Sequence, residues 1–226
     1  MSRNPITLQP TYATLFCGCG GFDYGFNQAG YRSVGAFDNN TNAVSVYNAN
    51  QIAAAHVVDL ANTVPSLAQT PDVVIAGPPC QGFSTLGKRQ LDDPRNSLFV
   101  RAAKLAVTLN PQVIAIENVT GLLSGSLAKH YQEAADVLTA AGYKIRLIRI
   151  AAADFGLPQI RKRIVLLAGQ VSLQDVKLPS QPRQSTLRDV LSKCHTTNHE
   201  PTKLTRDSDE ARIARRIAPH QKLCKD

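Results

Sequence analysis

Seven short apolar runs are spaced along roughly the first 170 residues of the chain. Each run is continuous and rich in β-branched residues, which is typical of strands buried within a sheet. The segments expected to form strands are Tyr12–Phe16, Ser33–Phe37, His56–Leu60, Asp72–Ala76, Gln112–Ile116, Lys144–Ile150 and Arg163–Ala168.

Four segments between these runs place apolar residues three and four positions apart, a spacing that predicts helices with one buried face. These segments are Phe22–Ala29, Asn42–Asn50, Asn96–Leu109 and Ala128–Ala141. The alternation of strands and helices predicts an α/β fold with a doubly wound, mostly parallel sheet of seven strands. Ligands bind such sheets at the carboxyl ends of the strands, so chemistry is expected in the loops that follow strands.

The pattern changes after about residue 170, where proline and polar residues become frequent and no further strand pattern follows. We therefore expect a first domain over residues 1–170 and a basic extension over residues 171–226. Residues 207–219 of the extension have a helix-like start, a short apolar stripe and flanking arginines. Such a basic helix is either a solvated face or a surface that contacts phosphates.

Composition limits the class of protein. The 226 residues are 43% hydrophobic, which is enough to bury a core. No stretch approaches the roughly 20 apolar residues of a membrane span, so we expect a soluble, cytoplasmic protein, associated with the nucleoid if its source is prokaryotic. The five cysteines are scattered without a CxxC pair, which favours reduced thiols and offers no zinc spacing.

Positive charge is concentrated in one part of the chain. Residues 1–142 contain 8 Lys and Arg against 9 Asp and Glu, whereas residues 143–226 contain 17 against 8, a net charge of +9. This asymmetry fits a neutral small-molecule site joined to a surface that meets a polyanion, most often nucleic acid. A basic tail that only keeps the protein soluble is the alternative on charge alone.

A glycine-rich turn follows the first expected strand. It spans Phe16–Gly21, and its glycines let the backbone approach a ligand closely. Asp38 ends the second expected strand about 20 residues further on, where a carboxylate can accept hydrogen bonds from ribose hydroxyls, and the third ends near Asp59. These residues favour a cofactor with an adenosine moiety, although the turn lacks the third spaced glycine of a dinucleotide fingerprint and each acid also fits a cap or a turn.

Two further strands end in groups suited to catalysis. Pro78 and Pro79 fix the backbone just ahead of Cys80, and a loop position at this end of the sheet favours a nucleophilic thiol over a buried structural one. The fifth strand ends in Glu117–Val119, where the carboxyl group is expected to meet the Cys80 loop. A lone glutamate at a strand end would otherwise be solvated.

Four segments resemble motifs of the cytosine-5 DNA methyltransferase family, in the family's order, and the resemblance covers residues 12–168. They are LFCGCGGFDYGF at Leu15–Phe26, PPCQGFS at Pro78–Ser84, ENV at Glu117–Val119 and QIRKR at Gln159–Arg163. The resemblance implies the Rossmann-like fold of S-adenosylmethionine-dependent methyltransferases, and we expect the last of the seven strands to be antiparallel. It further implies S-adenosylmethionine as cofactor, S-adenosylhomocysteine as product, no metal, and double-stranded DNA as partner.

The resemblance also implies roles for individual residues. Cofactor contacts are assigned to Phe16, Gly18, Gly20, Gly21, Asp38, Asn39, Asp59, Pro78 and Leu98, with Asp38 on the ribose, Asn39 beside the adenine and Asp59 near its amino group. Catalytic roles are assigned to Cys80, Glu117, Arg161 and Arg163, and substrate contacts to Ser84, Asn118 and Gln159.

The implied chemistry explains these residue types, because C5 of cytosine is a poor nucleophile. A Cys80 thiolate would add to C6 while Glu117 hydrogen-bonds N3 and the exocyclic amine, and the base must first leave the duplex stack. Arg161 and Arg163 fall on the same side of a strand and would hold the flipped nucleotide. Charges that guard a sheet edge are the alternative interpretation.

A full enzyme of this family continues past the QIRKR strand into a target recognition region and late motifs that are not recognisable here. A fragment, a split enzyme with a second chain that supplies the rest, and a truncated gene product are the three explanations. Each predicts a weak or inactive isolated chain, because groove reading needs a recognition element. An RNA (transfer RNA) cytosine-5 methyltransferase, a non-catalytic subunit and, more distantly, a nicotinamide-dependent oxidoreductase remain alternatives. No residue identifies a target sequence or a restriction partner.

Overall fold

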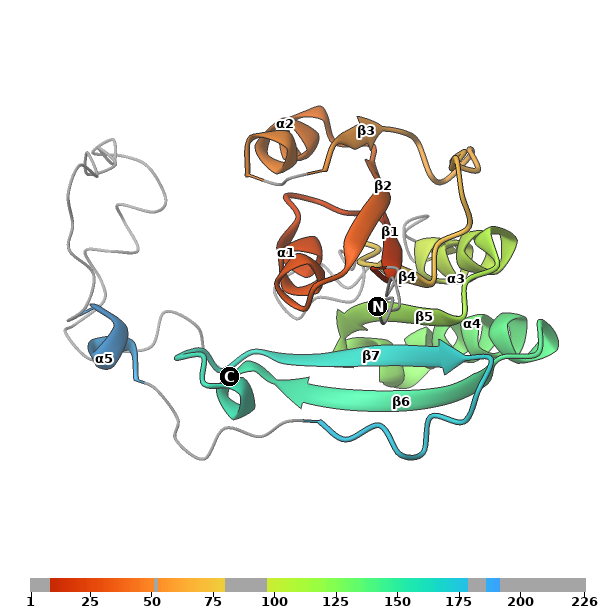
Figure 1. Ribbon diagram of the computed structural model, residues 1–226. Helices are drawn as coiled ribbons and strands as arrows, with labels where there is room; N and C mark the ends of the chain where they lie inside the picture. The colour runs from red at the N-terminus through yellow and green to blue at the C-terminus, as the bar shows by residue number, and fades with distance from the viewer. Residues whose placement is uncertain (1–8, 51–52, 80–96, 179–185, 192–226) are drawn as a thin grey trace, which may run out of the picture. The chain divides into compact units, whose positions relative to one another are not determined.

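Figure 1 shows the computed structural model of the chain, which describes residues 9–50, 53–79, 97–178 and 186–191. The chain divides into two compact units, Met1–Thr186 and Leu187–Asp226. The described part of the second unit is one short helix, α5 (Leu187–Leu191). All other described elements belong to the first unit, and the domain boundary expected near residue 170 remains a prediction.

A seven-stranded sheet forms the centre of the first unit, in the order β3-β2-β1-β4-β5-β7-β6. Pairing is parallel from β3 to β5, whereas β7 is antiparallel to both of its neighbours. The predicted sheet with an antiparallel last strand is confirmed. Its strands are β1 (Thr11–Leu15), β2 (Arg32–Asp38), β3 (Ala55–Val57), β4 (Val73–Ala76), β5 (Val113–Val119), β6 (Lys144–Ala151) and β7 (Lys162–Gly169).

Helices cover both faces of the sheet, as a doubly wound fold requires (Figure 1). On one face lie α1 (Gly21–Gln28) and α2 (Thr41–Asn50), and on the other α3 (Leu98–Leu109) and α4 (Ala128–Ala140). Three short 3₁₀ turns, η2 (Thr120–Leu123), η3 (Gly125–Leu127) and η4 (Ala152–Phe155), join neighbouring elements. No helix in the described ranges is long and apolar enough to cross a membrane.

The two faces of the sheet differ in how well they are buried. Side chains of β5 and β7 that face α3 and α4 are fully buried: Ile114, Ile116, Ile164, Leu166 and Ala168. Alternate residues of the same strands point to the α1 face, and there Val113, Val165 and Leu167 are only half-buried. At β5 and β7 the sheet is therefore more tightly covered on the face of α3 and α4 than on the α1 face, although Tyr12 and Ile75 of the central strands are fully buried on the α1 face.

Two strands end three residues away from their predicted ends, whereas the other strand ends agree to within one residue. β3 ends at Val57 rather than Leu60, because Asp59 begins a turn in which its carbonyl accepts a hydrogen bond from the Thr63 N–H (2.8 Å). β5 continues three residues beyond its predicted end, because its pairing with β7 extends to Val119 opposite Arg163. Glu117 consequently lies inside a paired strand.

The chain that leaves β7 is fastened to the neighbouring strand β6. The Arg146 guanidinium donates hydrogen bonds to the backbone carbonyls of Leu173 (2.8 Å), Gln174 (3.2 Å) and Val176 (2.7 Å). One side chain thereby satisfies three carbonyl groups of a segment without regular structure.

Candidate active site

The carboxyl ends of the first four strands surround a cavity of about 380 Å³. β1 and β4 are neighbours here, while the chain between them winds away through β2 and β3, so the cavity lies at the topological switch point of the sheet. Its volume falls in the usual range of small-ligand sites. The lining residues are Phe16, Gly18, Asp38, Asn39, Asn40, Asp59, Leu60, Ala61, Gly77, Pro79 and Leu98.

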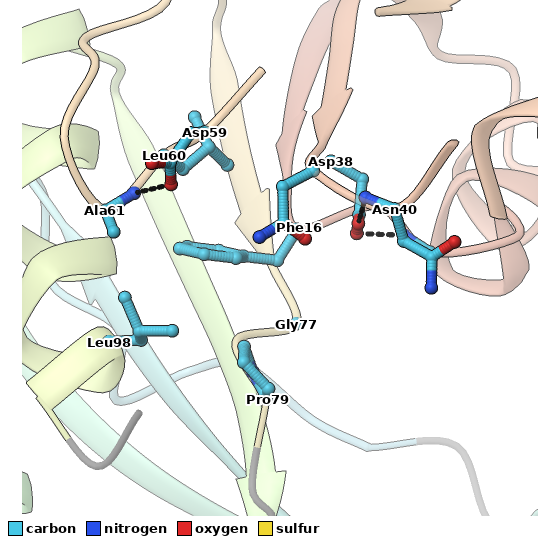
Figure 2. Close-up of a pocket in the computed structure, with 11 residues that line it drawn as sticks. Phe16, Asp38, Asn40, Asp59, Leu60, Ala61, Gly77, Pro79 and Leu98 are labelled. Atoms are coloured by element: carbon cyan, nitrogen blue, oxygen red, sulfur yellow. Dashed lines mark hydrogen bonds between the residues drawn. The ribbon is translucent and has the colours of Figure 1, made fainter. Parts of the chain in front are cut away.

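Phe16 gives the cavity its aromatic surface. Its φ of 55° lies in the left-handed region, which costs a residue with a Cβ about 1–2 kcal/mol. Hydrogen bonds on either side hold this backbone, from Gly77 N–H to the Leu15 carbonyl (3.1 Å) and from Cys17 N–H to the Phe37 carbonyl (3.0 Å). Figure 2 shows the ring extending across the cavity between the Leu60–Ala61 turn and Leu98. A flat aromatic ring beside aliphatic carbons is suited to a planar base.

Asp38 forms one side of the cavity at the end of β2. Its Oδ2 accepts a hydrogen bond from the Gly18 N–H (2.9 Å), and its Oδ1 accepts one from the Asn40 N–H (2.9 Å). The carboxylate thus connects the glycine-rich turn to the chain that enters α2. Each carboxylate oxygen retains a lone pair, so the group can still accept hydrogen bonds from a pair of ligand hydroxyls.

Asp59 forms the opposite side of the cavity, in the turn after β3. Its Oδ1 accepts a hydrogen bond from the Ala61 N–H (3.0 Å), and its Oδ2 accepts one from Asn62 Nδ2 (2.8 Å). Leu60 anchors the turn in the core with 2% of its surface exposed. The turn therefore holds the Asp59 carboxylate in one orientation.

Six of the nine residues expected to contact a cofactor line this cavity: Phe16, Gly18, Asp38, Asn39, Asp59 and Leu98. Gly20, with φ 89°, caps α1, Gly21 begins that helix, and Pro78 is buried beside the cavity's Gly77 and Pro79. Five lining residues were missed by the sequence analysis: Asn40, Leu60, Ala61, Gly77 and Pro79. Each lies within two positions of an expected residue, so proximity along the loops was the available signal.

Cys80 and Ser84 lie outside the described residues, but the chain that leads to Cys80 is described as far as Pro79. The Pro78 carbonyl accepts a hydrogen bond from Asn118 Nδ2 (3.3 Å), and Asn118 Oδ1 accepts one from the Val119 N–H (2.9 Å). Asn118 is buried, with 1% of its surface exposed. Its side chain thus joins the end of β5 to the segment that precedes Cys80 by two residues.

Glu117 and Arg163 form an ion pair between β5 and β7, with Arg163 Nε 2.8 Å from Glu117 Oε1. Arg163 also donates from Nη1 to the Lys162 carbonyl (2.8 Å). Burial raises the pKa of Glu117 above its ordinary value, although the positive charges of Arg163 and Arg161 act in the opposite direction. A carboxyl group with a raised pKa can hold a proton closer to neutral pH and donate it in a hydrogen bond.

Arg161 and Gln159 lie on the loop that enters β7, and both are exposed. The Arg161 N–H donates to the Gln159 carbonyl (3.0 Å), and the Arg161 carbonyl accepts a hydrogen bond from the Ala152 N–H (2.9 Å). The structure therefore pairs Glu117 with Arg163, places Arg161 where its charge acts on Glu117, and turns the neighbouring Asn118 side chain to the Pro78 carbonyl instead. Gln159 faces solvent.

A family model described as C-5 cytosine-specific DNA methylase matches residues 11–223. Among curated proteins, the type II methyltransferase M.AgeI of Thalassovita gelatinovora is 38% identical over 161 residues, which cover 67% of this chain and 38% of that protein. The type II methyltransferase M.HgiDI of Herpetosiphon aurantiacus is 35% identical over 194 residues, covering 82% and 62% of the two chains. The chain thus spans less than two thirds of the length of these relatives.

Solved structures share the same fold. A DNA modification methyltransferase encoded within a prophage of E. coli superposes with a TM-score of 0.69 at 27% identity, covering 80% of this chain and 54% of that one. The Dnmt2 methyltransferase of S. pombe superposes with a TM-score of 0.57 at 23% identity, covering 82% and 54%, and shows likeness of fold alone.

Proposed function

Because this chain belongs to the C-5 cytosine-specific DNA methylase family, we propose that it carries the catalytic part of a DNA methyltransferase that methylates C5 of cytosine. The hydrogen bond from Asn118 to the Pro78 carbonyl is the observation that supports this most directly. It holds the strand end that carries Glu117 next to the segment that leads into Cys80, as a nucleophile and its carboxyl partner require. Both lie at the carboxyl edge of the sheet that also forms the cavity.

The cavity supports S-adenosylmethionine as the methyl donor, which when bound supplies an electrophilic methyl group. Phe16 and Leu98 would enclose the adenine, Asp38 would accept hydrogen bonds from the ribose hydroxyls, and Asp59 would accept one from the adenine amino group. The lone pairs left on both carboxylates fit these tasks. Asn39 lines the same cavity beside Asp38.

The protein's own residues would activate the cytosine. The Cys80 thiolate adds to C6, which places electron density on C5 and on the N3–C4 amidine of the ring, and the ring takes up a proton at N3. Glu117 is the group that donates this proton to N3 through a hydrogen bond, and its raised pKa supports that role. C5 would then take the methyl group, and S-adenosylhomocysteine would be the leaving group. The C5 proton passes to solvent, the N3 proton returns to Glu117, and expulsion of the thiolate regenerates Cys80 and leaves 5-methylcytosine.

Arg163 would keep the Glu117 carboxyl group oriented throughout this cycle, since the two side chains are already ion-paired. Arg161, with Ser84 and Gln159, would contact the flipped nucleotide and its phosphates. We propose double-stranded DNA as the macromolecular substrate and the cytoplasm as the site of action.

Trapping with 5-fluorocytosine tests the proposal, because fluorine at C5 blocks the elimination of the thiolate. The full chain is incubated with S-adenosylmethionine and a duplex library of random sequence that contains 5-fluorocytosine, alone and with extract from its source organism. After nuclease digestion, mass spectrometry is expected to find a methylated fluorocytosine nucleotide on Cys80.

The control variant Cys80→Ser should form no adduct, and Glu117→Gln should form it at least tenfold more slowly if the carboxyl group assists the addition. An adduct that survives Cys80→Ser, or no adduct with or without extract, would contradict the proposal. A parallel library of RNA containing 5-fluorocytosine distinguishes the alternative substrate: capture of RNA alone would replace DNA with RNA.

A further inference from the structure

Arg101, on α3, connects two walls of the cofactor cavity without lining that cavity itself. Its Nε donates a hydrogen bond to the Leu60 carbonyl (3.0 Å), and its Nη2 donates one to the Thr63 carbonyl (3.3 Å). Both acceptors belong to the turn after β3, 38 to 41 residues away in sequence. A planar guanidinium suits two parallel acceptors of this kind, because its donors form a fixed fork.

The turn that Arg101 holds carries Asp59 as a rigid unit. Both Asp59 carboxylate oxygens accept hydrogen bonds from within the turn, from Ala61 N–H and Asn62 Nδ2. The Asp59 carbonyl also accepts hydrogen bonds from the N–H groups of Asn62 (3.2 Å) and Thr63 (2.8 Å). Any displacement of the turn therefore moves the Asp59 carboxylate with it.

The same stretch of α3 also forms the facing wall. Leu98 lines the cavity at the first residue of the helix, and Arg101 follows it by three positions, on the same side of the helix. In Figure 2, Leu98 lies across the Phe16 ring from Leu60 and Ala61. The distance between these walls consequently depends on how Arg101 holds the turn against α3.

We infer that Arg101 is a positioning residue. By holding the turn after β3, it keeps the Asp59 carboxylate where it can accept a hydrogen bond from the amino group of adenine, and so determines selectivity for adenine. The inference rests on the proposed S-adenosylmethionine site. Two hydrogen bonds from one cation fix the turn at the carbonyls on both sides of Ala61, a residue of the cavity lining. Their loss lets the turn move away from α3 and weakens the recognition of the base edge.

Binding of two ligands to the full chain tests the inference by isothermal titration calorimetry. One ligand is S-adenosylhomocysteine, and the other is S-inosylhomocysteine, whose base carries a 6-oxo group in place of the amino group. Arg101→Met should weaken binding of S-adenosylhomocysteine about tenfold, as expected for two lost hydrogen bonds, and should narrow the preference over S-inosylhomocysteine about fivefold. Arg101→Lys should retain part of the affinity for S-adenosylhomocysteine and part of the preference over S-inosylhomocysteine.

The control is Lys104→Met, which removes the same charge from an exposed position one turn further along α3. It should change the dissociation constant of either ligand less than twofold. A proportional loss for both ligands, with the preference unchanged, would show a merely structural role and overturn the inference. Unchanged constants in Arg101→Met would overturn it as well. If Arg101→Met does not fold, the preference measured for Arg101→Lys decides. Failure of the unsubstituted chain to bind either ligand would instead remove the proposed cofactor site, and the inference with it.

Discussion

Asp23 is a fully buried acid in the first turn of α1. Its Oδ1 accepts hydrogen bonds from Thr14 Oγ1 (2.5 Å) and the Tyr47 hydroxyl (2.8 Å), whereas its Oδ2 is buried without a hydrogen-bond partner. Burial raises the pKa of Asp23 despite these hydrogen bonds. Burial and the Asp23 charge also raise the pKa of the Cys17 thiol to about 12, so Cys17 is expected to be unreactive near neutral pH.

The raised pKa of Asp23 makes the free energy of unfolding depend on pH. The unfolded chain ionises near the ordinary value of about 4, while the folded chain still holds the proton, so stability falls as pH rises from there to the folded pKa. Asp23→Asn keeps an acceptor oxygen for both hydroxyls and has no such titration. We therefore expect the free energy of unfolding of Asp23→Asn, relative to that of the unsubstituted protein, to be higher at pH 8 than at pH 5 by about 1 kcal/mol or more. Urea unfolding of both proteins at the two pH values measures this difference.

Asp72 provides a comparison of opposite sign. It accepts hydrogen bonds from the N–H (2.7 Å) and hydroxyl (2.8 Å) of Thr11, which lower its pKa. Asp72→Asn should be destabilising above about pH 4, and the difference should shrink as pH falls through the lowered pKa. If the free energies of unfolding of Asp23→Asn and Asp72→Asn, each relative to the unsubstituted protein, changed in the same direction with pH, the opposite pKa shifts assigned to the two acids would be contradicted.

Residues of the candidate site divide into those that a sequence pattern can identify and those that it cannot. Asp38 and Asp59 follow apolar runs, so their place at one edge of the sheet could be predicted. The contact between Asn118 and Pro78 could not, because it depends on β4 and β5 being neighbours in the sheet. Arg101 was missed for the same reason: nothing in a helical pattern signals that its guanidinium meets carbonyls of a distant turn.

At the scale of the element, β7 separates two cores of unequal quality. Neighbouring leucines on this strand differ in environment: Leu166 is fully buried toward α3 and α4, and Leu167 is half-buried on the α1 face. Leu166→Ala should destabilise the protein by about 3 kcal/mol, whereas Leu167→Ala should cost roughly half as much, because less apolar surface and a smaller cavity are involved. Chemical denaturation of the two variants measures the difference, and equal losses would show that both faces are equally sealed.

Among the described residues of the first unit, periodicity predicted each strand and each α-helix to within a few residues. The exceptions have local causes. The turn that Asp59 closes is specified by side-chain hydrogen bonds, which end β3 before its apolar run ends. The extra residues of β5 depend on its partner β7, and pairing across a sheet is not encoded in the periodicity of either strand alone.

At the scale of the whole molecule, the cavity and the surplus of positive charge come from different parts of the chain. The cavity is built from residues of the nearly neutral part, whereas residues 143–226 carry a net charge of +9. Arg163 and Arg146 are engaged with Glu117 and with backbone carbonyls, while Arg161 and Lys162 are exposed beside the candidate site. These exposed cations form a surface suited to phosphates.

Binding of DNA should therefore weaken steeply with salt. A plot of log K against log salt has a slope of about −0.9 for each phosphate neutralised, so Lys162→Gln should make the slope less negative by about one. The matched control is Arg32→Gln. Arg32 is exposed at the first residue of β2 and so lies at the amino end of the parallel strands, whereas Lys162 lies near their carboxyl ends. Fluorescence anisotropy with a labelled duplex measures the slope for each variant. Equal changes of the slope in the two variants would indicate a general effect of net charge rather than a defined binding surface.

The fastening of residues 173–176 by Arg146 bears on where the first unit would tolerate an insertion. The hydrogen bonds hold the backbone as far as Val176, seven residues past β7. Residues inserted between Gly169 and Leu173 would therefore form a surface loop, while the carbonyl groups beyond the insertion keep their place beside β6.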